Sequence, residues 1–183
     1  MGAISGLPSD APYLYNSSRP LILGHRGSMG IFPEHTRPSY SSAYAEGVDF
    51  VELDLQITKD WHFITSHDPC LKETTDIEDH PEFADRRGNF SFDFPYGDNY
   101  FDDFLIHDFT LAELKTLKRR QRFDFRNQDM NDLFPMMTLE ETIDLMYSMQ
   151  KKNPTEGRSS PIGLYIETKM YEFYLKNYNI DSA

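Results

Sequence analysis

The sequence predicts an α/β fold: a parallel (β/α) barrel of which residues 20–183 form about the first half, with a surface insertion at about residues 76–105. One observation is a set of four short apolar runs that carry, or end in, residues able to move protons or bind a metal: Leu21–Gly27, Val51–Leu55, Phe63–Asp68 and Ile162–Lys169. The other is the helical periodicity between them, which gives the order strand, helix, strand, strand, helix, strand. A closed barrel of this kind needs eight strands and typically about 250 residues, whereas these 183 residues hold about four strands.

The first elements follow from local signals in the sequence. Residues 1–19 are proline-rich and predict an extended lead-in. Leu21–Leu23 is a continuous apolar run, which is typical of a strand buried on both faces. A helix is expected at about Pro38–Glu46, with Thr36 as its N-cap and Gly47 at the C-cap position.

The second strand, Phe50–Ile57, is the most informative element. Its alternation places Glu52 and Asp54 on one face and apolar side chains on the other. Lys59-Asp60 then makes a tight turn into a third strand at about Trp61–Ser66.

Beyond residue 76 the residue composition changes. The segment to residue 103 is acidic and aromatic without a regular period, which predicts an inserted excursion on the surface. Two capping boxes, Thr110–Glu113 and Thr138–Glu141, each predict the start of a helix. The basic run Lys118–Arg122 is interpreted as a solvated helix end.

Composition limits the partners. The formal net charge is −12, which disfavours nucleic acid and anionic membrane surfaces. Cys70 is the single cysteine, so no disulfide within the chain is possible, and no apolar run approaches the ~20 residues of a membrane-spanning helix. The location is left open: no signal peptide is visible, while two glycosylation sequons, at Asn16 and Asn89, lean toward a secreted protein.

Glu52 and Asp54 are candidate metal ligands. Two residues apart on a strand, their carboxylates lie on one face about 6.5 Å apart and suit a hard divalent cation, Mg²⁺ or Ca²⁺. The alternative is a charged stripe on an edge strand, but the apolar flanks favour a central strand. Glu167 would complete the ligand set with Lys169 beside it as a phosphate-binding cation, unless these two form an ordinary pair at a strand end.

His25 and His67 each follow an apolar run. Two histidines facing one metal would serve phosphodiester cleavage, one taking a proton from the nucleophile and the other giving a proton to the leaving alkoxide. Arg26 would hold a phosphate oxygen through its planar guanidinium group. Taken alone, each histidine is more often an ordinary loop residue.

Five motifs occur in order along the chain: His25-Arg26-Gly27, Pro33-Glu34-His35-Thr36, Gly47–Leu55, Ser66-His67-Asp68 and Tyr165–Lys169. Together they resemble the glycerophosphodiester phosphodiesterase family, and the likeness, to its insertion-bearing members, covers nearly the whole chain after residue 19. The resemblance implies a TIM barrel and the hydrolysis of glycerophosphodiesters to glycerol 3-phosphate and an alcohol with a divalent cation. It implies the following site residues: His25 and His67 as the acid/base pair, Glu52, Asp54 and Glu167 as metal ligands, and Arg26, Glu34 and Lys169 as substrate-binding groups, Glu34 supporting substrate or metal.

The sequence departs from the family pattern in two ways. His35 stands where the family usually has Asn, and the later strands of the barrel are absent. Two alternatives therefore stay open. One is a truncated, non-catalytic fragment that binds a cation or a partner, self-association through the open side of the barrel included. The other is a phospholipase-D-like relative that acts on larger phospholipids.

Overall fold

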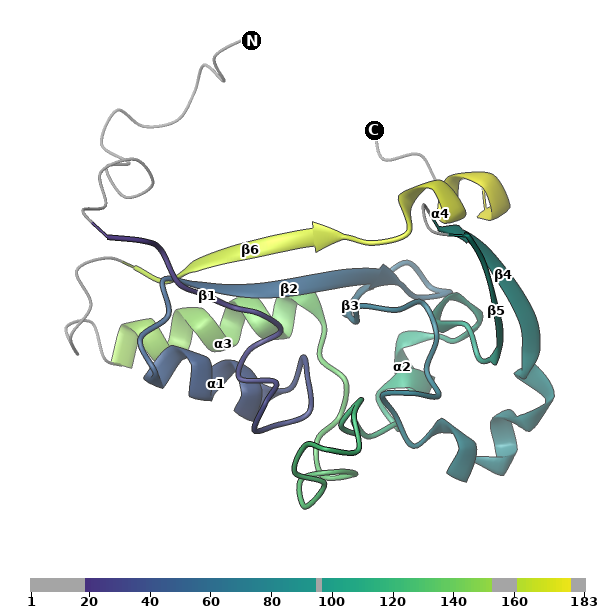
Figure 1. Cartoon of the computed structure of the whole chain (residues 1–183), viewed down its shortest axis with the longest axis horizontal. Coiled ribbons are helices and arrows are strands. Elements are labelled where there is room, and N and C mark those ends of the chain that lie inside the picture. The colour runs from purple at the N-terminus through teal and green to yellow at the C-terminus, as the bar shows by residue number, and fades with distance from the viewer. Residues whose placement is uncertain (1–18, 95–96, 153–160, 179–183) are drawn as a thin grey trace, which may run out of the picture.

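The computed structural model describes residues 19–94, 97–152 and 161–178, organised around one central strand, β2 (Phe50–Ile57). Two strands pair with β2 in parallel, β1 (Leu23–Gly24) and β6 (Gly163–Thr168). β3 (Phe63–Thr65) folds back against the end of β2 in an antiparallel hairpin. Figure 1 shows this sheet with helices beneath it. The predicted α/β fold and the central position of β2 are confirmed.

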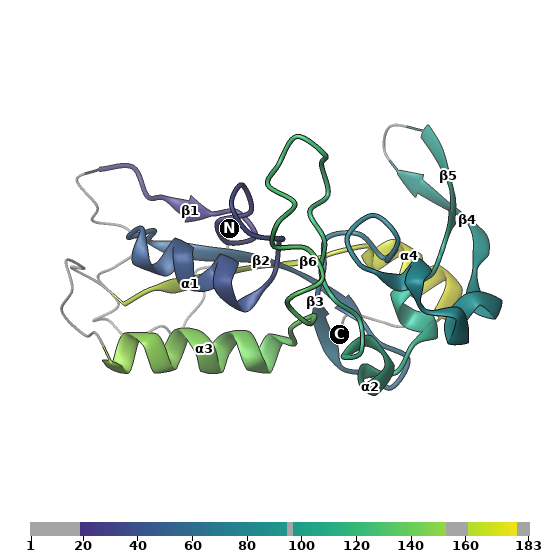
Figure 2. The same cartoon turned by 90° about the horizontal axis from the view of Figure 1, so that it is seen from below.

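Two helices cover one face of the sheet, α1 (Arg37–Ala45) and α3 (Leu139–Lys152). Seen from below, they lie side by side and run roughly along the direction of β2 and β6 (Figure 2). The apolar face of β2 packs against them in a single core, formed by Tyr40, Ala43, Tyr44, Val51, Leu53, Leu55, Leu145 and Met146. The opposite, polar face of β2 is thereby left for the loops that carry the candidate site residues.

Local signals set the helix starts as predicted. The Thr36 side chain accepts a hydrogen bond from the Ser39 backbone N–H at the first turn of α1. At the start of α3, Thr138 and Glu141 exchange side-chain and backbone hydrogen bonds. The short helix α2 (Leu111–Leu114) begins with a complete capping box at Thr110.

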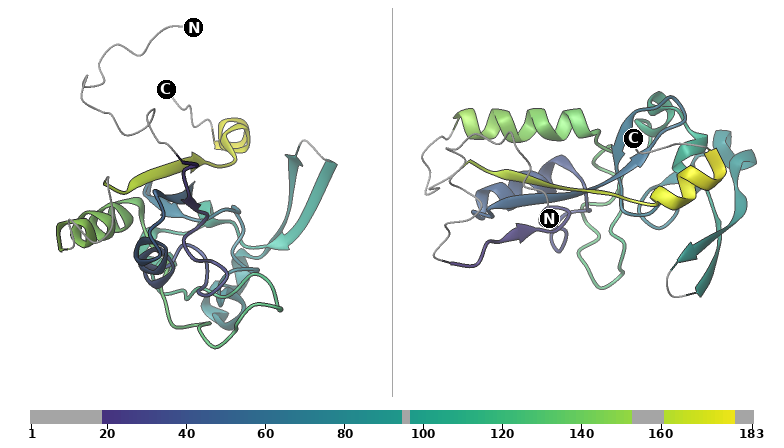
Figure 3. Two further views of the ribbon diagram at one scale, coloured as in Figure 1. Left: turned by 60° about the vertical axis from the view of Figure 1, so that its left-hand side comes forward. Right: turned by 90° about the horizontal axis from the view of Figure 1, so that it is seen from above.

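The excursion at 76–105 is more regular than predicted. It contains the 3₁₀ turns η1 (Ile77–Asp79) and η2 (Pro81–Arg86) and an antiparallel hairpin of β4 (Gly88–Phe94) and β5 (Gly97–Asp103). The hairpin projects away from the sheet (Figure 3). The alternation of Phe90, Phe92 and Phe94 was the strand signal that the sequence analysis missed.

The prediction that this excursion lies wholly on the surface is also wrong. Ile77 and Phe83 are buried in a second core, which they share with residues beyond the hairpin. Those partners include Ile106 of η3 (Ile106–Asp108) and the apolar residues of and after α2. Apolar side chains at the base of the segment therefore anchor it.

The first strand is shorter and more exposed than predicted. Only Leu23 and Gly24 pair with β2, and the side chains of Leu21, Ile22 and Leu23 are exposed. An apolar run predicts burial on both faces only when a neighbour covers each face, and among the described residues none covers the outer side of this run. The lead-in at 1–18, with the Asn16 sequon, lies outside the described residues.

The basic run Lys118–Arg122 does not end a helix, since α2 stops at Leu114. It is an extended segment in which Arg119 and Gln121 are buried, as is Leu117 just before it. Arg119 is fully buried and donates hydrogen bonds to the Thr65 carbonyl and the Thr74 hydroxyl. The last helix, α4 (Tyr171–Tyr178), follows β6, and none of the described helices is long and apolar enough to span a bilayer.

Replacing Leu53 with alanine should lower the free energy of unfolding by about 2–5 kcal/mol, because it leaves a cavity between β2 and the helices. Its partner in the β2–β6 register, Ile166, is 45% exposed. The matched control Ile166→Ala should therefore lower the same quantity by about 1 kcal/mol or less. Urea unfolding measures both, and equal losses would contradict this description of the core.

Candidate active site

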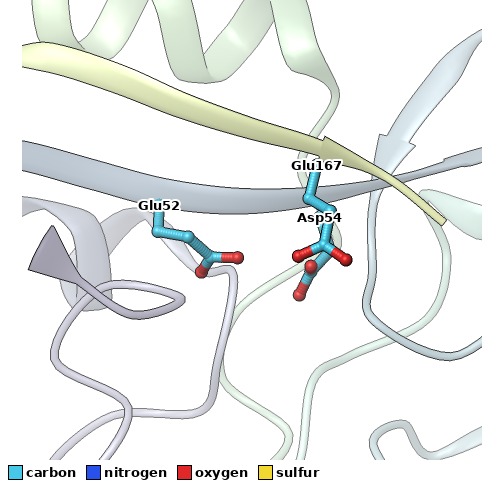
Figure 4. A group of neighbouring side chains, drawn as sticks. All are labelled: Glu52, Asp54 and Glu167. Carbon is cyan, nitrogen blue, oxygen red and sulfur yellow. The ribbon is translucent and has the colours of Figure 1, made fainter.

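Three carboxylates converge on the polar face of the sheet. Glu52 and Asp54 project from β2, and the parallel register places Glu167 of β6 opposite Asp54. One oxygen of each side chain lies within 4.8 Å of the others, as Figure 4 illustrates. Glu52 and Asp54 are buried, whereas Glu167 is exposed. The structure thus brings Glu167 to two carboxylates that lie more than a hundred residues earlier in the sequence, and the three form one oxygen-rich cluster.

The electrostatics of this cluster fit a divalent cation. Burial and the charge of Asp54 raise the pKa of Glu52 to about 7. Asp54 Oδ1 is buried and accepts no hydrogen bond from the residues that the structure describes, although Lys169 Nζ lies 3.2 Å away. A carboxyl with a raised pKa beside a buried carboxylate oxygen that only Lys169 approaches, among the described residues, offers oxygen ligands of the kind that Mg²⁺ or Ca²⁺ binds.

His35 supports Asp54 from the far side. Burial lowers the pKa of His35, so the ring is neutral and only one of its nitrogens donates. Nε2 lies 3.2 Å from Asp54 Oδ2, and Nδ1 lies 2.7 Å from the Tyr40 hydroxyl. Since an ionised carboxylate only accepts, Nε2 donates to Asp54 and Nδ1 accepts from Tyr40. His35 therefore connects Asp54 to Tyr40 of α1.

The hydrogen bond from His35 helps to keep Asp54 ionised. Burial alone would raise the pKa of Asp54, but the hydrogen bond from His35 and the charge of Lys169 hold it well below its ordinary value. Lys169 Nζ also lies 2.5 Å from Glu167 Oε1. The structure therefore places Lys169 among the candidate ligands.

Arg26 joins the loop after β1 to the carboxylates. Its backbone N–H donates to Glu52 Oε2 at 2.7 Å, and its guanidinium group lies 3.3 Å from Glu34 and 3.2 Å from Asp54. The turn depends on Gly27, where φ is +79° and an added Cβ would lie 2.5 Å from the Ser39 hydroxyl. A side chain at this position would push the loop away from α1 and Arg26 away from Glu52.

His25 and His67 lie on the two loops beside the cluster. Burial and the charge of Arg26 lower the pKa of His25 against the opposing effect of Asp54, so the ring is ready to accept a proton at neutral pH. Ser66, the residue before His67, donates its backbone N–H to the Asp54 carbonyl at 3.0 Å, and Arg26, the residue after His25, donates its backbone N–H to Glu52. Each histidine is therefore the chain neighbour of a residue that is hydrogen-bonded to β2 at the cluster.

The His67 loop is fixed at two points. Gln56 of β2 donates to the His67 backbone carbonyl at 2.8 Å, and Tyr174 of α4 donates to Gln56 at 2.8 Å. The ring itself is held through Nδ1, which lies 2.7 Å from Asp68 Oδ1.

Arg122 is a site residue that the sequence analysis missed. It was interpreted as part of a solvated helix end, but its guanidinium group bonds three acidic side chains: Glu34, Asp68 and Glu73. In the structure, burial alternates at Leu117, Arg119 and Gln121, but two of these residues are polar, so the sequence shows no hydrophobic alternation that would predict a strand. Nor does the sequence identify partners on distant loops.

Comparison with known proteins identifies the family of the chain. The Glycerophosphoryl diester phosphodiesterase family matches residues 25–176. Glycerophosphodiester phosphodiesterase GDPD6 of Arabidopsis thaliana is 45% identical over 143 residues, which are 76% of this chain and 37% of that protein. The Haemophilus influenzae glycerophosphodiester phosphodiesterase is 26% identical over 96% of this chain and 47% of its own length. The chain thus spans about half, or less, of the length of these relatives.

Solved structures share the fold of the chain. A phosphodiesterase of Oleispira antarctica, in complex with the product sn-glycerol-3-phosphate, superposes with a TM-score of 0.53 at 26% identity, over 85% of this chain and 47% of that one. A glycerophosphodiester phosphodiesterase of Agrobacterium tumefaciens gives a TM-score of 0.50 at 21% identity over 82% and 47%, which shows a shared fold. With most of its length matched and 45% identity to one relative, the chain belongs to the glycerophosphoryl diester phosphodiesterase family.

Proposed function

We propose that this chain carries the metal-binding and proton-transfer machinery of a glycerophosphodiester phosphodiesterase, which hydrolyses glycerophosphodiesters to glycerol 3-phosphate and an alcohol. The observation that carries the proposal is the convergence of Glu52, Asp54 and Glu167 within 4.8 Å, next to loops that bear two histidines. A cation-dependent screen of the chain on glycerophosphocholine tests it. Hydrolysis that a chelator abolishes supports the proposal.

Glu52, Asp54 and Glu167 would hold the cation, Mg²⁺ or Ca²⁺. When bound, it supplies positive charge that offsets the charge of the phosphodiester in a strongly acidic protein. Arg26 and Lys169 would contact phosphate oxygens, and Glu34 would orient Arg26 toward them, supporting substrate or metal.

The two histidines would divide the proton transfers. One imidazole takes a proton from the attacking oxygen, that of water or of the substrate's own glycerol hydroxyl, as this oxygen bonds to phosphorus. The other gives a proton to the leaving alkoxide as the second phosphorus–oxygen bond breaks. When the glycerol hydroxyl attacks, water opens the resulting cyclic phosphodiester in a later step, which gives glycerol 3-phosphate. With Nδ1 of His67 donating to Asp68, Nε2 of His67 is the nitrogen that exchanges the proton.

The chain would form the first half of a TIM barrel, with the segment at about 76–105 as an insertion. In support, Leu21, Ile22 and Leu23 at one side of the sheet and Tyr165 and Ile166 on β6 are exposed. Exposed apolar strand residues of this kind need a covering partner. Further strands of a longer polypeptide, or a second copy of this chain, would cover them.

A second candidate function follows from these exposed strands. The chain binds a cation, but it hydrolyses no substrate until further strands or a second copy of the chain cover the exposed residues. Cation binding without hydrolysis by the purified chain would favour this candidate. Sedimentation of the same sample distinguishes a self-associated form from a monomer.

Glu52→Gln should weaken Mg²⁺ or Ca²⁺ binding by about tenfold or more, because it removes one charged oxygen ligand. Isothermal titration calorimetry measures the affinity. Glu140→Gln, an exposed acid in the first turn of α3, makes the same charge change and should leave the affinity unaltered. Undiminished binding by Glu52→Gln would show that the ligand assignment is wrong.

Cation affinity should rise with pH up to about 7 and then level off. The pKa of Glu52, raised to about 7 by burial and Asp54, means that below pH 7 a proton must leave before the cation binds. Loss of one proton corresponds to about a tenfold gain in affinity per pH unit below that pH. Titrations at successive pH values measure the slope, which Glu52→Gln should flatten; an equal slope in this variant would exclude Glu52 as the titrating group.

His25→Ala and His67→Ala should each abolish measurable hydrolysis of glycerophosphocholine while leaving cation binding intact, because neither imidazole belongs to the ligand cluster. Turnover assays and calorimetry on the same samples separate the two effects. The control is His62→Ala, since His62 is a half-exposed residue of the β2–β3 turn. Full turnover by either site variant would remove that histidine from the mechanism.

A further inference from the structure

We infer that Arg122 is a positioning residue: it ties the His25 loop to the His67 loop and, through Asp68, fixes the orientation of the His67 ring. The inference rests on the proposed function of His67 in proton transfer. It assigns a role to a residue that lies on neither of the two loops and on none of the strands that carry the candidate ligands.

The contacts of Arg122 connect the two loops directly. Nε and Nη2 donate to the two oxygens of Glu34 at 3.2 and 2.8 Å, the two-bond arrangement that makes arginine–carboxylate pairs specific. Nη1 donates to Asp68 Oδ2 and to Glu73. One guanidinium group therefore joins the loop after β1 to the loop after β3.

Asp68 passes this constraint on to His67. Its Oδ2 accepts from Arg122 and its Oδ1 from His67 Nδ1 at 2.7 Å. Burial alone would raise the pKa of Asp68, but the hydrogen bond from His67 and the charge of Arg122 lower it, so Asp68 stays ionised and only accepts. The His67 proton is thereby held on Nδ1 and Nε2 is left for the substrate.

Burial argues against an ordinary surface ion pair. The side chain of Arg122 is 11% exposed, Glu34 is almost completely buried, and three acidic side chains occupy the guanidinium donors. Arg120, two residues earlier, also bonds two carboxylates, those of Asp79 and Asp132, but on the open surface. Arg120→Gln is therefore a matched control with the same change in charge.

The first experiment follows the His67 ring in the full chain by nitrogen NMR of labelled histidine, which distinguishes a protonated from a bare ring nitrogen. The expected result is one form with the proton on Nδ1 in the native chain and in Arg120→Gln. Arg122→Gln should show a mixture of the two tautomers, because Asp68 is no longer held in place. Ring signals in Arg122→Gln that match those of the native chain would overturn the inference.

The second experiment measures turnover of glycerophosphocholine. Arg122→Gln should lower kcat about 10–100-fold, the range typical when a group that orients an active-site residue is lost, and leave KM within about threefold. Asp68→Asn should lower kcat similarly, and the double variant should lose little more than either single one. Additive losses, or a loss no larger than that of Arg120→Gln, would contradict the inference.

Two controls separate a loss of folding, or a failure of the proposed function, from the loss of the Arg122 contacts. If circular dichroism shows that Arg122→Gln is unfolded, Arg122→Lys replaces it in both experiments, since an ammonium group keeps one carboxylate contact and should give intermediate values. If the native chain has no turnover, the proposed function fails for the chain alone, while the NMR comparison still decides whether Arg122 positions His67.

Discussion

The parallel register of β2 with β6 is the constraint on which the rest of the site depends. By pairing Asp54 with Glu167 and leaving Glu52 on the same face, it forces three acidic groups into one small volume. Such a cluster is unfavourable in a buried place unless positive charge or a proton offsets it. The raised pKa of Glu52 and the approach of Lys169 and Arg26 are both responses to that repulsion.

The region around Glu34 is rich in positive charge, although the chain as a whole is strongly acidic. A protein with a formal net charge of −12 concentrates several of its cations on one side of the sheet. Arg26 and Arg122 share Glu34, and Arg119 lies fully buried behind them. Because guanidinium groups offer several donors in a rigid plane, they can hold two or three acidic side chains in fixed relation. The loops that bear the histidines are shaped by these contacts more than by backbone pairing.

The sequence predicted those parts of the fold that local patterns determine. Period-two alternation identified β2 and its two faces, and the caps at Thr36, Thr110 and Thr138 located three helix starts. The convergence of Glu167 with the β2 carboxylates followed from parallel pairing. What could not be predicted depends on contacts between distant residues: the partners of Arg122, the burial of Arg119 and the exposure of the first strand. The hairpin at 88–103 was readable from its phenylalanine alternation, but the acidic residues between obscured it.

The attachment of β6 to the sheet would also depend on the carboxylate cluster. It contributes one carboxylate to the cluster, and its last four residues are exposed to solvent. A strand held mainly by its hydrogen bonds to one neighbour is among the first parts of a sheet to detach. An ion bound jointly by Asp54 and Glu167 would link β6 to β2 by a second set of bonds, in addition to the backbone hydrogen bonds between them. Loading the site would then slow amide exchange along β6 even where no catalysis takes place.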